Sequence, residues 1–461
     1  MEYVSTRGDA PRLGFADTLL AGLASDGGLY VPERWPVLAD GAAERFASAR
    51  YQDIAVEVMG PFVEGSIGRD ELRALVEQAY ASFDDPDVVP LRPLGDDLQL
   101  LELFHGPTLA FKDVALQFIG PLFEQELRRR RSRVTIVGAT SGDTGSAAIE
   151  ACRDRDAIDV FILHPVGRVS EVQRRQMTTV DAANVHNIAI EGTFDDCQDL
   201  VKLLFADVEF RERRHLSAVN SMNWARVVAQ VVYYVAAWAR LGGGPIAYAV
   251  PTGNFGNVFA GHVAQQMGVD VNQFVVGSNR NDILARFFES GTMTMSDVHP
   301  TLSPSMDIQV SSNFERLLFE LYGRVGHRVA AMMAEFRATG TMTVGSEELA
   351  SLDDRWSAAR LDDEQTKLVM KDVYERTGTL LDPHTAVGVG AAREVHRDSE
   401  VPMVCLATAH PAKFPDAVRE ATGVEPARPA VLADLFDRPE RYDVLANDLA
   451  AVRSHIDSVL G

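Results

Sequence analysis

From about residue 96 onward, short apolar runs rich in β-branched residues alternate with longer stretches that have helical spacing. The expected strands are 98–104, 134–137, 160–163, 187–190, 246–250, 274–276 and 403–407. The expected helices include 146–152, 224–241, 314–338, 364–376 and 385–396. Because strands that alternate with helices form parallel sheets covered by helices, the pattern predicts an α/β fold.

The first 85 residues lack this alternation. Apolar residues recur at helical steps over 15–24 and 67–83, and the charged segment 84–87 is interrupted by a proline, as is typical of a boundary. We therefore expect a mainly helical N-terminal domain at 1–85 and a larger region at 86–461, with a smaller α/β subdomain at about 130–215. Residues 291–312, rich in Ser, Thr, Met and Pro, are expected to form a long ordered loop.

Composition excludes several classes of protein. The formal net charge of −22 argues against non-specific binding to nucleic acid or to anionic membranes. The three cysteines, Cys152, Cys197 and Cys405, are far apart and form no C-x-x-C pair, so neither a disulfide scaffold nor a structural metal site is expected. No apolar leader and no apolar stretch of membrane-spanning length is evident. We expect a location in the cytoplasm, which is a reducing compartment.

A single lysine, Lys112, lies in the otherwise apolar stretch 105–113, at the expected start of a helix. Burial disfavours the ammonium form of a lysine, and the neutral amine can form a Schiff base with a carbonyl substrate or with pyridoxal phosphate. The alternative is an ordinary first-turn lysine whose stem lies along the surface. Taken alone, the stretch favours this alternative, whereas the remaining motifs favour the first interpretation.

Two glycine-rich loops, 138–145 and 253–257, each follow an expected strand and open a helix, where backbone N–H groups bind anions. The second loop adds two Asn side chains and suits a phosphate. The first carries Asp143, which would repel a phosphate, so this loop suits a carboxylate held by N–H and hydroxyl groups. The alternative for each loop is a tight turn that needs glycine for positive φ. Neither loop has the glycine pattern of nicotinamide or ATP sites.

These two loops, the lysine stretch and the segment 408–414 together resemble threonine synthase, a pyridoxal-phosphate enzyme of the tryptophan-synthase-β fold type (fold type II). Further matching segments occur in order along nearly the whole chain, at 5–8, 26–30, 167–170, 220–226, 306–308, 312–316 and 382–385. The N-terminal matches indicate the longer branch of the family. The resemblance implies two parallel-sheet domains with the cofactor between them, a mainly helical N-terminal domain, and catalysis by the region 86–461.

The family converts O-phospho-L-homoserine and water to L-threonine and phosphate by γ-elimination and β-addition, the last step of threonine biosynthesis. By resemblance, Lys112 forms the aldimine with pyridoxal 5'-phosphate and shuttles protons. Thr408 would meet the pyridine nitrogen, and Asp143 would lie near the 3'-oxygen. The cofactor phosphate is expected on Gly253, Asn254, Phe255, Gly256 and Asn257.

The substrate sites follow from the same resemblance. The substrate carboxylate is expected on Thr140, Ser141 and Thr144, and the leaving phosphate on Arg226, with Asn223 beside it, because guanidinium binds phosphate bidentately. The alternative for Arg226 is an arginine on a helix surface. His105 and His384 are interpreted as structural groups, His105 at most supporting the site.

Other functions on the same cofactor stay open at this point. A phospho-lyase would release 2-oxobutanoate and ammonia from the same substrate, and a non-catalytic relative would only bind the cofactor. A serine or threonine dehydratase fits the segments 223–226 and 306–308 less well. A monomer or a homodimer is expected.

Overall fold

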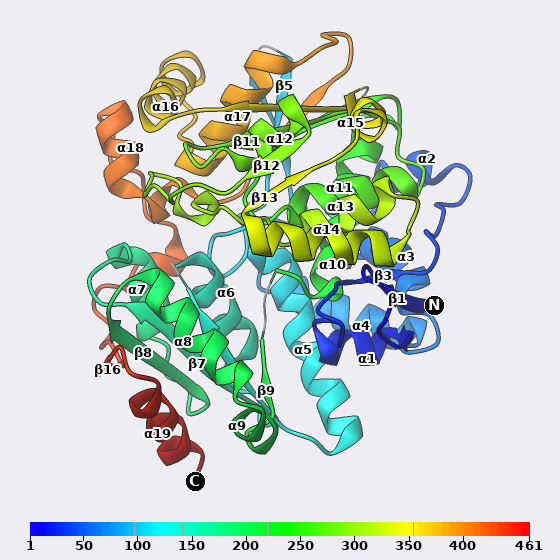
Figure 1. The fold of residues 1–461 in the computed structure, drawn as a ribbon. Helices are drawn as coiled ribbons and strands as arrows, with labels where there is room; N and C mark the ends of the chain where they lie inside the picture. The colour runs from blue at the N-terminus through cyan, green and yellow to red at the C-terminus, as the bar shows by residue number, and fades with distance from the viewer. Residues whose placement is uncertain (96, 141, 219–220, 354) are drawn as a thin grey trace. The chain divides into compact units, whose positions relative to one another are not determined.

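A computed structural model of the chain describes residues 1–95, 97–140, 142–218, 221–353 and 355–461. The chain forms two compact units, each assembled from two separate segments (Figure 1). Unit 1 comprises Met1–Gly106 and Ser221–Pro426, and unit 2 comprises Pro107–Asn220 and Ala427–Gly461. Residues 1–85 are thus grouped with the later part of unit 1, and the boundary at residue 85 stays a prediction.

Unit 1 is built on a six-stranded sheet. Its order is β14 (Trp356–Arg360), β11 (Val271–Ser278), β10 (Ile246–Pro251), β15 (Met403–Ala407), β5 (Leu98–Glu102) and β4 (Leu91–Gly95). Neighbouring strands are parallel except for β4, which pairs antiparallel with β5. The expected strands of this sheet are confirmed, whereas β14 and β4 were not expected.

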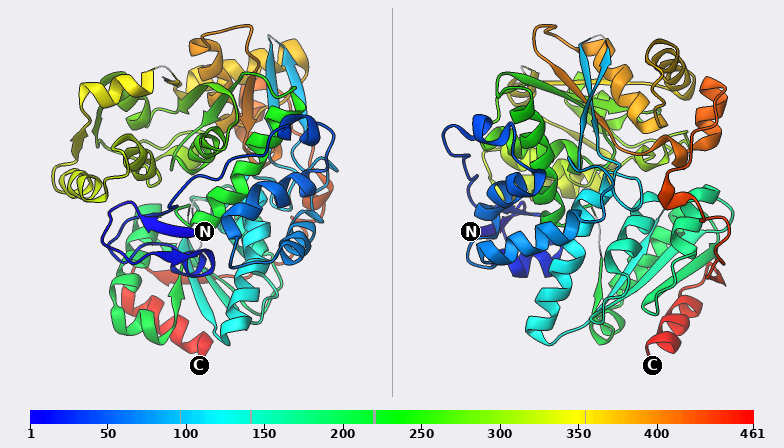
Figure 2. Two further views of the ribbon diagram at one scale, coloured as in Figure 1. Left: turned by 90° about the vertical axis from the view of Figure 1, so that its right-hand side faces the viewer. Right: turned by 180° about the vertical axis from the view of Figure 1, so that it is seen from behind.

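Helices cover both faces of this sheet (Figure 2). On one face, α17 (Pro383–Val395) lies so close to β10 and β11 that a Cβ atom at Gly277 would be 3.2 Å from the carbonyl oxygen of Val387. Outside α17 packs α16 (Asp363–Thr377). The opposite face carries α10 (Trp224–Arg240) and α11 (Gly256–Gln266), which pack against each other. Small residues at the contacts allow this close packing of helices on the sheet.

The N-terminal residues of unit 1 combine helices with a small sheet. Strands β2 (Leu13–Gly14), β1 (Glu2–Ser5) and β3 (Tyr30–Pro32) form an antiparallel sheet in this order. The helices here are α1 (Phe15–Ala21), α2 (Ala42–Phe46), α3 (Tyr51–Val63) and α4 (Arg69–Tyr80). Helix α3 packs on α10, and the rings of Phe62 and Trp224 are 6.0 Å apart, so this segment covers the long buried helix.

Unit 2 is built on a five-stranded parallel sheet. Its order is β16 (Asp443–Ala446), β8 (Val185–Glu191), β7 (Ile158–Pro165), β6 (Val134–Ala139) and β9 (Leu216–Ser217). One face packs on α8 (Phe194–Ala206), α9 (Val208–Arg213) and α19 (Leu449–Leu460). Helices α5 (Lys112–Arg130), α6 (Asp143–Cys152) and α7 (Glu171–Thr178) follow one another in contact. The C-terminal segment, with β16 and α19, completes this unit.

The structure corrects two expectations. The predicted helix 314–338 is two helices, α13 (Phe314–Leu321) and α14 (Gly326–Thr339), separated by a turn in which Gly323 has φ +62°. The predicted loop 291–312 contains strand β12 (Thr292–Thr294), which pairs with β13 (Thr341–Thr343), and a short 3-10 helix, η1 (Pro304–Met306). The remaining elements are α12 (Ile283–Ser290), α15 (Ser346–Asp353), η2 (Pro411–Lys413), α18 (Pro415–Thr422) and η3 (Ala430–Leu432).

Among the helices of the described residues, none combines the length and the apolar character that crossing a membrane requires.

Candidate active site

Lys112 is the first residue of α5 in unit 2, and its side chain is buried, with 6% of the residue exposed. The turn before the helix is tightly held. Leu109 has φ +61°, a left-handed conformation that costs a non-glycine residue about 1–2 kcal/mol. Asp113 offsets this cost, because its carboxylate accepts hydrogen bonds from the backbone N–H of Thr108 (2.8 Å) and from the Thr108 hydroxyl (2.6 Å). The lysine is therefore held at a fixed point rather than on a free surface.

Asp143 is the charged partner of this lysine. The Lys112 Nζ atom lies 3.3 Å from Asp143 Oδ2 and 5.0 Å from the centroid of the Phe111 ring. Both charged groups are buried, Asp143 at 3% exposure, so the pair is shielded from water. Sequence reasoning named both residues without predicting that they pair. The arrangement presents a positioned amine beside a fixed carboxylate.

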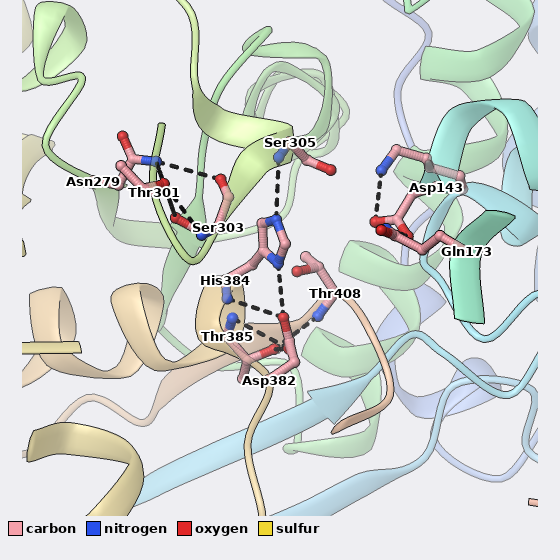
Figure 3. A network of polar contacts seen from close by, with 11 residues as sticks. Asp143, Gln173, Asn279, Thr301, Ser303, Ser305, Asp382, His384, Thr385 and Thr408 are labelled. Carbon is pink, nitrogen blue, oxygen red and sulfur yellow. Dashed lines mark hydrogen bonds and ion pairs between the residues drawn. The ribbon is translucent and has the colours of Figure 1, made fainter. Parts of the chain in front are cut away.

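A residue that sequence reasoning missed holds the other carboxylate oxygen. Gln173 Nε2 donates to Asp143 Oδ1 at 2.9 Å (Figure 3). Gln173 lies in the first turn of α7, where Ser170 is the N-cap and its hydroxyl both donates to Gln173 Oε1 and accepts from the Gln173 N–H. The S-x-x-Q spacing from Ser170 to Gln173 is a helix-start pattern that could have placed this glutamine at a helix N-terminus.

Thr140 has a structural role in the loop before Asp143. Thr140 Oγ1 accepts hydrogen bonds from the N–H groups of Gly142 (3.0 Å) and Gly145 (2.9 Å), so its hydroxyl oxygen helps to hold the loop closed. Thr144 is half-buried, and its hydroxyl makes no hydrogen bond to the described part of the chain. Ser141 lies outside the described residues.

In unit 1 the loop 253–257 opens helix α11. Phe255 is the N-cap residue, with φ +63°, and α11 begins at Gly256. Within the described residues, the backbone N–H groups of 254–257 donate to no protein acceptor, as is usual for the first turn of a helix. Two side chains hold carbonyl groups of the loop. Ser311 Oγ donates to the Gly253 oxygen (2.7 Å), and Asn313 Nδ2 donates to the Asn254 oxygen (2.9 Å).

The two Asn side chains of this loop are also oriented. The hydroxyl groups of Tyr233 and Tyr234 both donate to Asn257 Oδ1, which fixes the amide so that the buried Nδ2 is left as a donor without a partner in the described chain. Ser312 Oγ donates to Asn254 Oδ1 at 3.3 Å. A set of N–H donors at a helix N-terminus, without acceptors in the part of the chain that the structure describes, fits an anion such as the phosphate of pyridoxal phosphate.

Asn223 and Arg226 lie at the start of α10 in unit 1, and both are buried. Asn223 serves the fold: its Oδ1 accepts the N–H of Ala225 (3.1 Å), and its Nδ2 donates to the carbonyl oxygen of Leu19 (2.8 Å). The Arg226 Nη1 atom is buried and has no hydrogen-bond partner among the described residues. Burial lowers the pKa of Arg226 to about 10, so the guanidinium stays charged near neutral pH. Arg226 is therefore not on a helix surface.

Thr408 directly follows β15 and is 6% exposed. Its backbone N–H donates to Thr385 Oγ1 at 3.1 Å, while its own hydroxyl makes no hydrogen bond to any residue that the structure describes.

His105 lies between two carboxylates. Its Nδ1 lies 2.7 Å from Asp84 and its Nε2 2.9 Å from Glu102. Burial opposes the charge of His105, but these hydrogen bonds outweigh it and raise the pKa.

Comparison with known proteins identifies the family. The chain matches the family models for the threonine synthase N terminus at residues 2–80, pyridoxal-phosphate dependent enzymes at 88–336, and the threonine synthase C-terminal region at 385–456. Threonine synthase of Pseudomonas aeruginosa is 54% identical over 466 residues, covering 99% of this chain and 98% of the relative. That of Corynebacterium glutamicum is 42% identical, with 99% and 98% covered.

Solved structures agree over the whole chain. The pyridoxal-phosphate-bound threonine synthase of Brucella melitensis has a TM-score of 0.97 at 49% identity, covering 100% of this chain and 99% of that one. Yeast threonine synthase has a TM-score of 0.94 at 37% identity, covering 100% and 98%. These likenesses confirm the expected fold class. The chain belongs to the threonine synthase family of pyridoxal-phosphate-dependent enzymes.

Proposed function

We propose that this chain converts O-phospho-L-homoserine and water to L-threonine and phosphate with pyridoxal 5'-phosphate, and is thus a carbon–oxygen lyase. The observation that carries the proposal is the buried Lys112, held at the start of α5 beside Asp143. It lies in a chain whose N-terminal and C-terminal parts match threonine synthase models and whose central part matches pyridoxal-phosphate-dependent enzymes. When bound, the cofactor supplies an electron sink for negative charge that develops on substrate carbon.

Each unit, taken by itself, contains residues that suit one part of the cofactor. In unit 2, Lys112 is the covalent attachment point, and Asp143 orients its amine. In unit 1, the N–H donors of 254–257 and the Asn257 amide nitrogen have no acceptor among the described residues and suit the phosphate. The hydroxyl of Thr408, which has no partner among the same residues, suits the pyridine nitrogen. A neutral hydroxyl at that nitrogen leaves it largely unprotonated, in contrast to a carboxylate partner.

Lys112 also suits the proton transfers of the reaction. Removal of a proton from Cα and another from Cβ of the substrate requires a base that stays tethered at these carbons, and the amine of Lys112 fits that role when it is released from the cofactor. Asp143, fixed by Gln173, would keep this amine in place. Both side chains are buried, so competition from water at the amine would be limited.

Each charged end of the substrate has its own candidate residues. We propose that its carboxylate binds at the loop 140–144, through Ser141, the Thr144 hydroxyl and backbone N–H groups, with Thr140 closing the loop. The phosphate would bind Arg226, whose buried Nη1 atom lacks a partner in the described chain and so favours an anionic ligand. Asn223 would act by fixing the start of α10 that carries this arginine.

Reduction with borohydride tests the central assignment. Borohydride should fix the cofactor to one peptide, and that peptide should contain Lys112. The variant Lys112→Ala should lose both labelling and turnover, whereas Lys202→Ala, at an exposed lysine paired with Asp199, should keep both. Product analysis completes the test: threonine and phosphate in equal amounts support the proposal. Labelling of a different peptide, or 2-oxobutanoate as the main product, would overturn it.

The three cysteines are free and buried. Free thiols persist in a reducing compartment, so we further propose that the enzyme acts in the cytoplasm.

A further inference from the structure

We propose that Asp382 and His384 form a positioning pair that joins the residue at the pyridine nitrogen, Thr408, to the loop at the cofactor phosphate. The inference rests on the proposed function, which assigns the pyridine nitrogen of the cofactor to Thr408 and its phosphate to the loop 253–257. All the residues involved lie in unit 1, and Figure 3 shows their hydrogen bonds. Sequence reasoning had interpreted His384 only as a structural group.

Asp382 is the centre of the network. It is fully buried and is the N-cap of α17, where its Oδ1 accepts the N–H of His384 (2.9 Å) and its Oδ2 the N–H of Thr385 (3.3 Å). A buried carboxylate is stabilised by such donors and by the helix dipole. The same carboxylate also accepts from two side chains, the His384 ring (2.9 Å) and the Thr385 hydroxyl. Asp382 thus fixes both neighbours at once.

The contacts of His384 determine its tautomer. Its Nε2 atom faces the backbone N–H of Ser305 at 3.3 Å, and a backbone N–H can only donate. Nε2 must therefore accept, so it carries no proton. The proton of the neutral ring then lies on Nδ1, which donates to Asp382 at 2.9 Å. With Nε2 engaged as an acceptor and 4% of the residue exposed, His384 is poorly suited to donate a proton to substrate. Its role is to hold Ser305.

Ser305 connects His384 to the loop 253–257. A Cβ atom built on Gly253 would lie only 2.8 Å from the Ser305 carbonyl oxygen and 3.2 Å from the Met306 Cα atom, so the two backbones are in direct contact. The segment around Ser305 is held a second time by Asp307, whose carboxylate accepts from Thr301 Oγ1 (2.6 Å) and Asn279 Nδ2 (2.8 Å). Because it is fixed on both sides, this segment can serve as a backing for the loop 253–257.

Thr385 connects Asp382 to Thr408. Its hydroxyl donates to Asp382 Oδ2 and accepts the N–H of Thr408 at 3.1 Å. This bond fixes the backbone of Thr408 and leaves its own hydroxyl without a partner in the described chain. The chain of contacts therefore runs from Thr408 through Thr385, Asp382, His384 and Ser305 to Gly253. Both ends of the bound cofactor would be aligned by one hydrogen-bonded network.

Two substitutions of His384 separate its two hydrogen bonds. In His384→Asn the amide NH₂ takes the place of Nδ1 and can still donate to Asp382, but the acceptor for Ser305 is lost. In His384→Gln the amide oxygen approximates Nε2 and can still accept from Ser305, but the donor to Asp382 is lost. The readouts are the dissociation constant of the apoprotein for pyridoxal phosphate and the ³¹P resonance of the bound cofactor. Thermal unfolding of each apoprotein checks the fold.

His384→Asn should weaken cofactor binding by about tenfold, the usual effect of an unsatisfied buried N–H, and should move the ³¹P resonance. His384→Gln should bind the cofactor within about threefold of the wild type and keep the resonance. Equal effects of the two variants, or no effect of either, would overturn the proposal.

Two substitutions of Thr385 test its hydrogen bond to Thr408. Thr385→Val removes the acceptor for the Thr408 N–H, so it should shift the visible absorption band and lower kcat while the ³¹P resonance stays in place. Thr385→Ser should restore both. An unchanged band in Thr385→Val, or no rescue by serine, would overturn this end of the network. The outcome is separable from the proposed function, because borohydride labelling of Lys112 in the wild type tests that function independently of position 385.

Discussion

The Nζ atom of Lys112 and the Oδ2 atom of Asp143 lie 3.3 Å apart at the starts of two successive helices, α5 and α6. Neither side chain is exposed, so the two opposite charges interact in a buried environment, where the low effective dielectric constant makes the interaction strong. An opposite charge this close favours the charged form of an amine.

Asp143→Asn should therefore make Lys112 more reactive in the apoprotein. Loss of the charged partner favours the neutral amine, so trinitrophenylation of Lys112 by trinitrobenzenesulfonate, with sulfite as the leaving group, should be about tenfold faster at pH 7, as expected for one lost charge-assisted hydrogen bond. The labelled peptide is quantified by mass spectrometry. Asp181→Asn, at an exposed aspartate, serves as the control and should label at the wild-type rate. Equal rates for Asp143→Asn and the wild type would contradict the role of this carboxylate.

Gln173 should affect the site through Asp143. Gln173→Glu puts a carboxylate where an amide donor now lies 2.9 Å from Asp143 Oδ1, and two buried carboxylates repel each other. We expect a loss of about 1–3 kcal/mol in the free energy of unfolding at neutral pH, with partial recovery at acidic pH where one carboxyl is protonated. Urea unfolding at two pH values measures both. Gln173→Met, which removes the donor without adding charge, should not show the recovery at acidic pH.

Asn254→Asp should weaken cofactor binding before it weakens the fold. The Asn254 Oδ1 atom accepts from Ser312, and a carboxylate can accept the same hydrogen bond, so folding is spared. The new charge, however, would face the dianionic phosphate of the cofactor. An equilibrium titration of the apoprotein with pyridoxal phosphate should show a dissociation constant raised well above that of Asn254→Ala. Similar constants for the two variants would mean that the phosphate lies away from this loop.

Arg226 and Arg316 form a natural comparison, since both are fully buried arginines of unit 1. Arg316 donates to the carbonyl oxygens of Tyr30 (2.9 Å) and Met222 (2.7 Å), and burial lowers its pKa to about 9, whereas Arg226 has an unpaired Nη1 atom within the described chain. Arg226→Met should keep the thermal stability of the apoprotein and the visible spectrum, yet lose about 2–4 kcal/mol of transition-state binding in kcat/KM for phosphohomoserine.

Arg316→Met should do the reverse, with a loss of about 1–3 kcal/mol in stability because its carbonyl acceptors are left unpaired. Steady-state phosphate release and thermal unfolding distinguish the two. Near-normal kcat/KM in Arg226→Met would direct the search for the phosphate ligand to other cations. Loss of the cofactor in the same variant would mark Arg226 as a ligand of the cofactor phosphate instead.

The sequence predicted the elements that its local pattern defines. The central strands β6, β7, β10 and β15 are buried on both faces and read as continuous apolar runs, and α10 is a long apolar helix between clear end signals. By contrast, β16 has three exposed residues of four and becomes a strand only because it pairs with β8, which lies far away in sequence. Such long-range pairing leaves no local signal, and neither does the division of each unit into two segments.

The candidate site was predicted residue by residue only where a motif determines the role. Lys112, Asp143 and the loop 253–257 lie at helix starts, as the spacing of glycine and strand residues indicated. Turn geometry, which a sequence does not show, decides that the Thr140 hydroxyl accepts from two nearby N–H groups. The Asn223 amide likewise bonds to Ala225 and to Leu19, which is 204 residues away along the chain. The same holds for Gln173 and His384, whose partners lie about 30 and 80 residues away along the chain.

The pairing of β8 with β16 has a kinetic consequence. Residues 221–426, almost half of the protein, lie between these two strands in the sequence, so closing the five-stranded sheet requires a contact of very high sequence separation. Contacts of this kind form late, because the entropy of loop closure must be overcome first. Prior folding of the intervening segment would shorten the effective loop. In pulsed hydrogen exchange during refolding, the amides of β16 should therefore gain protection after those of β10 and β11, the strands of the intervening segment.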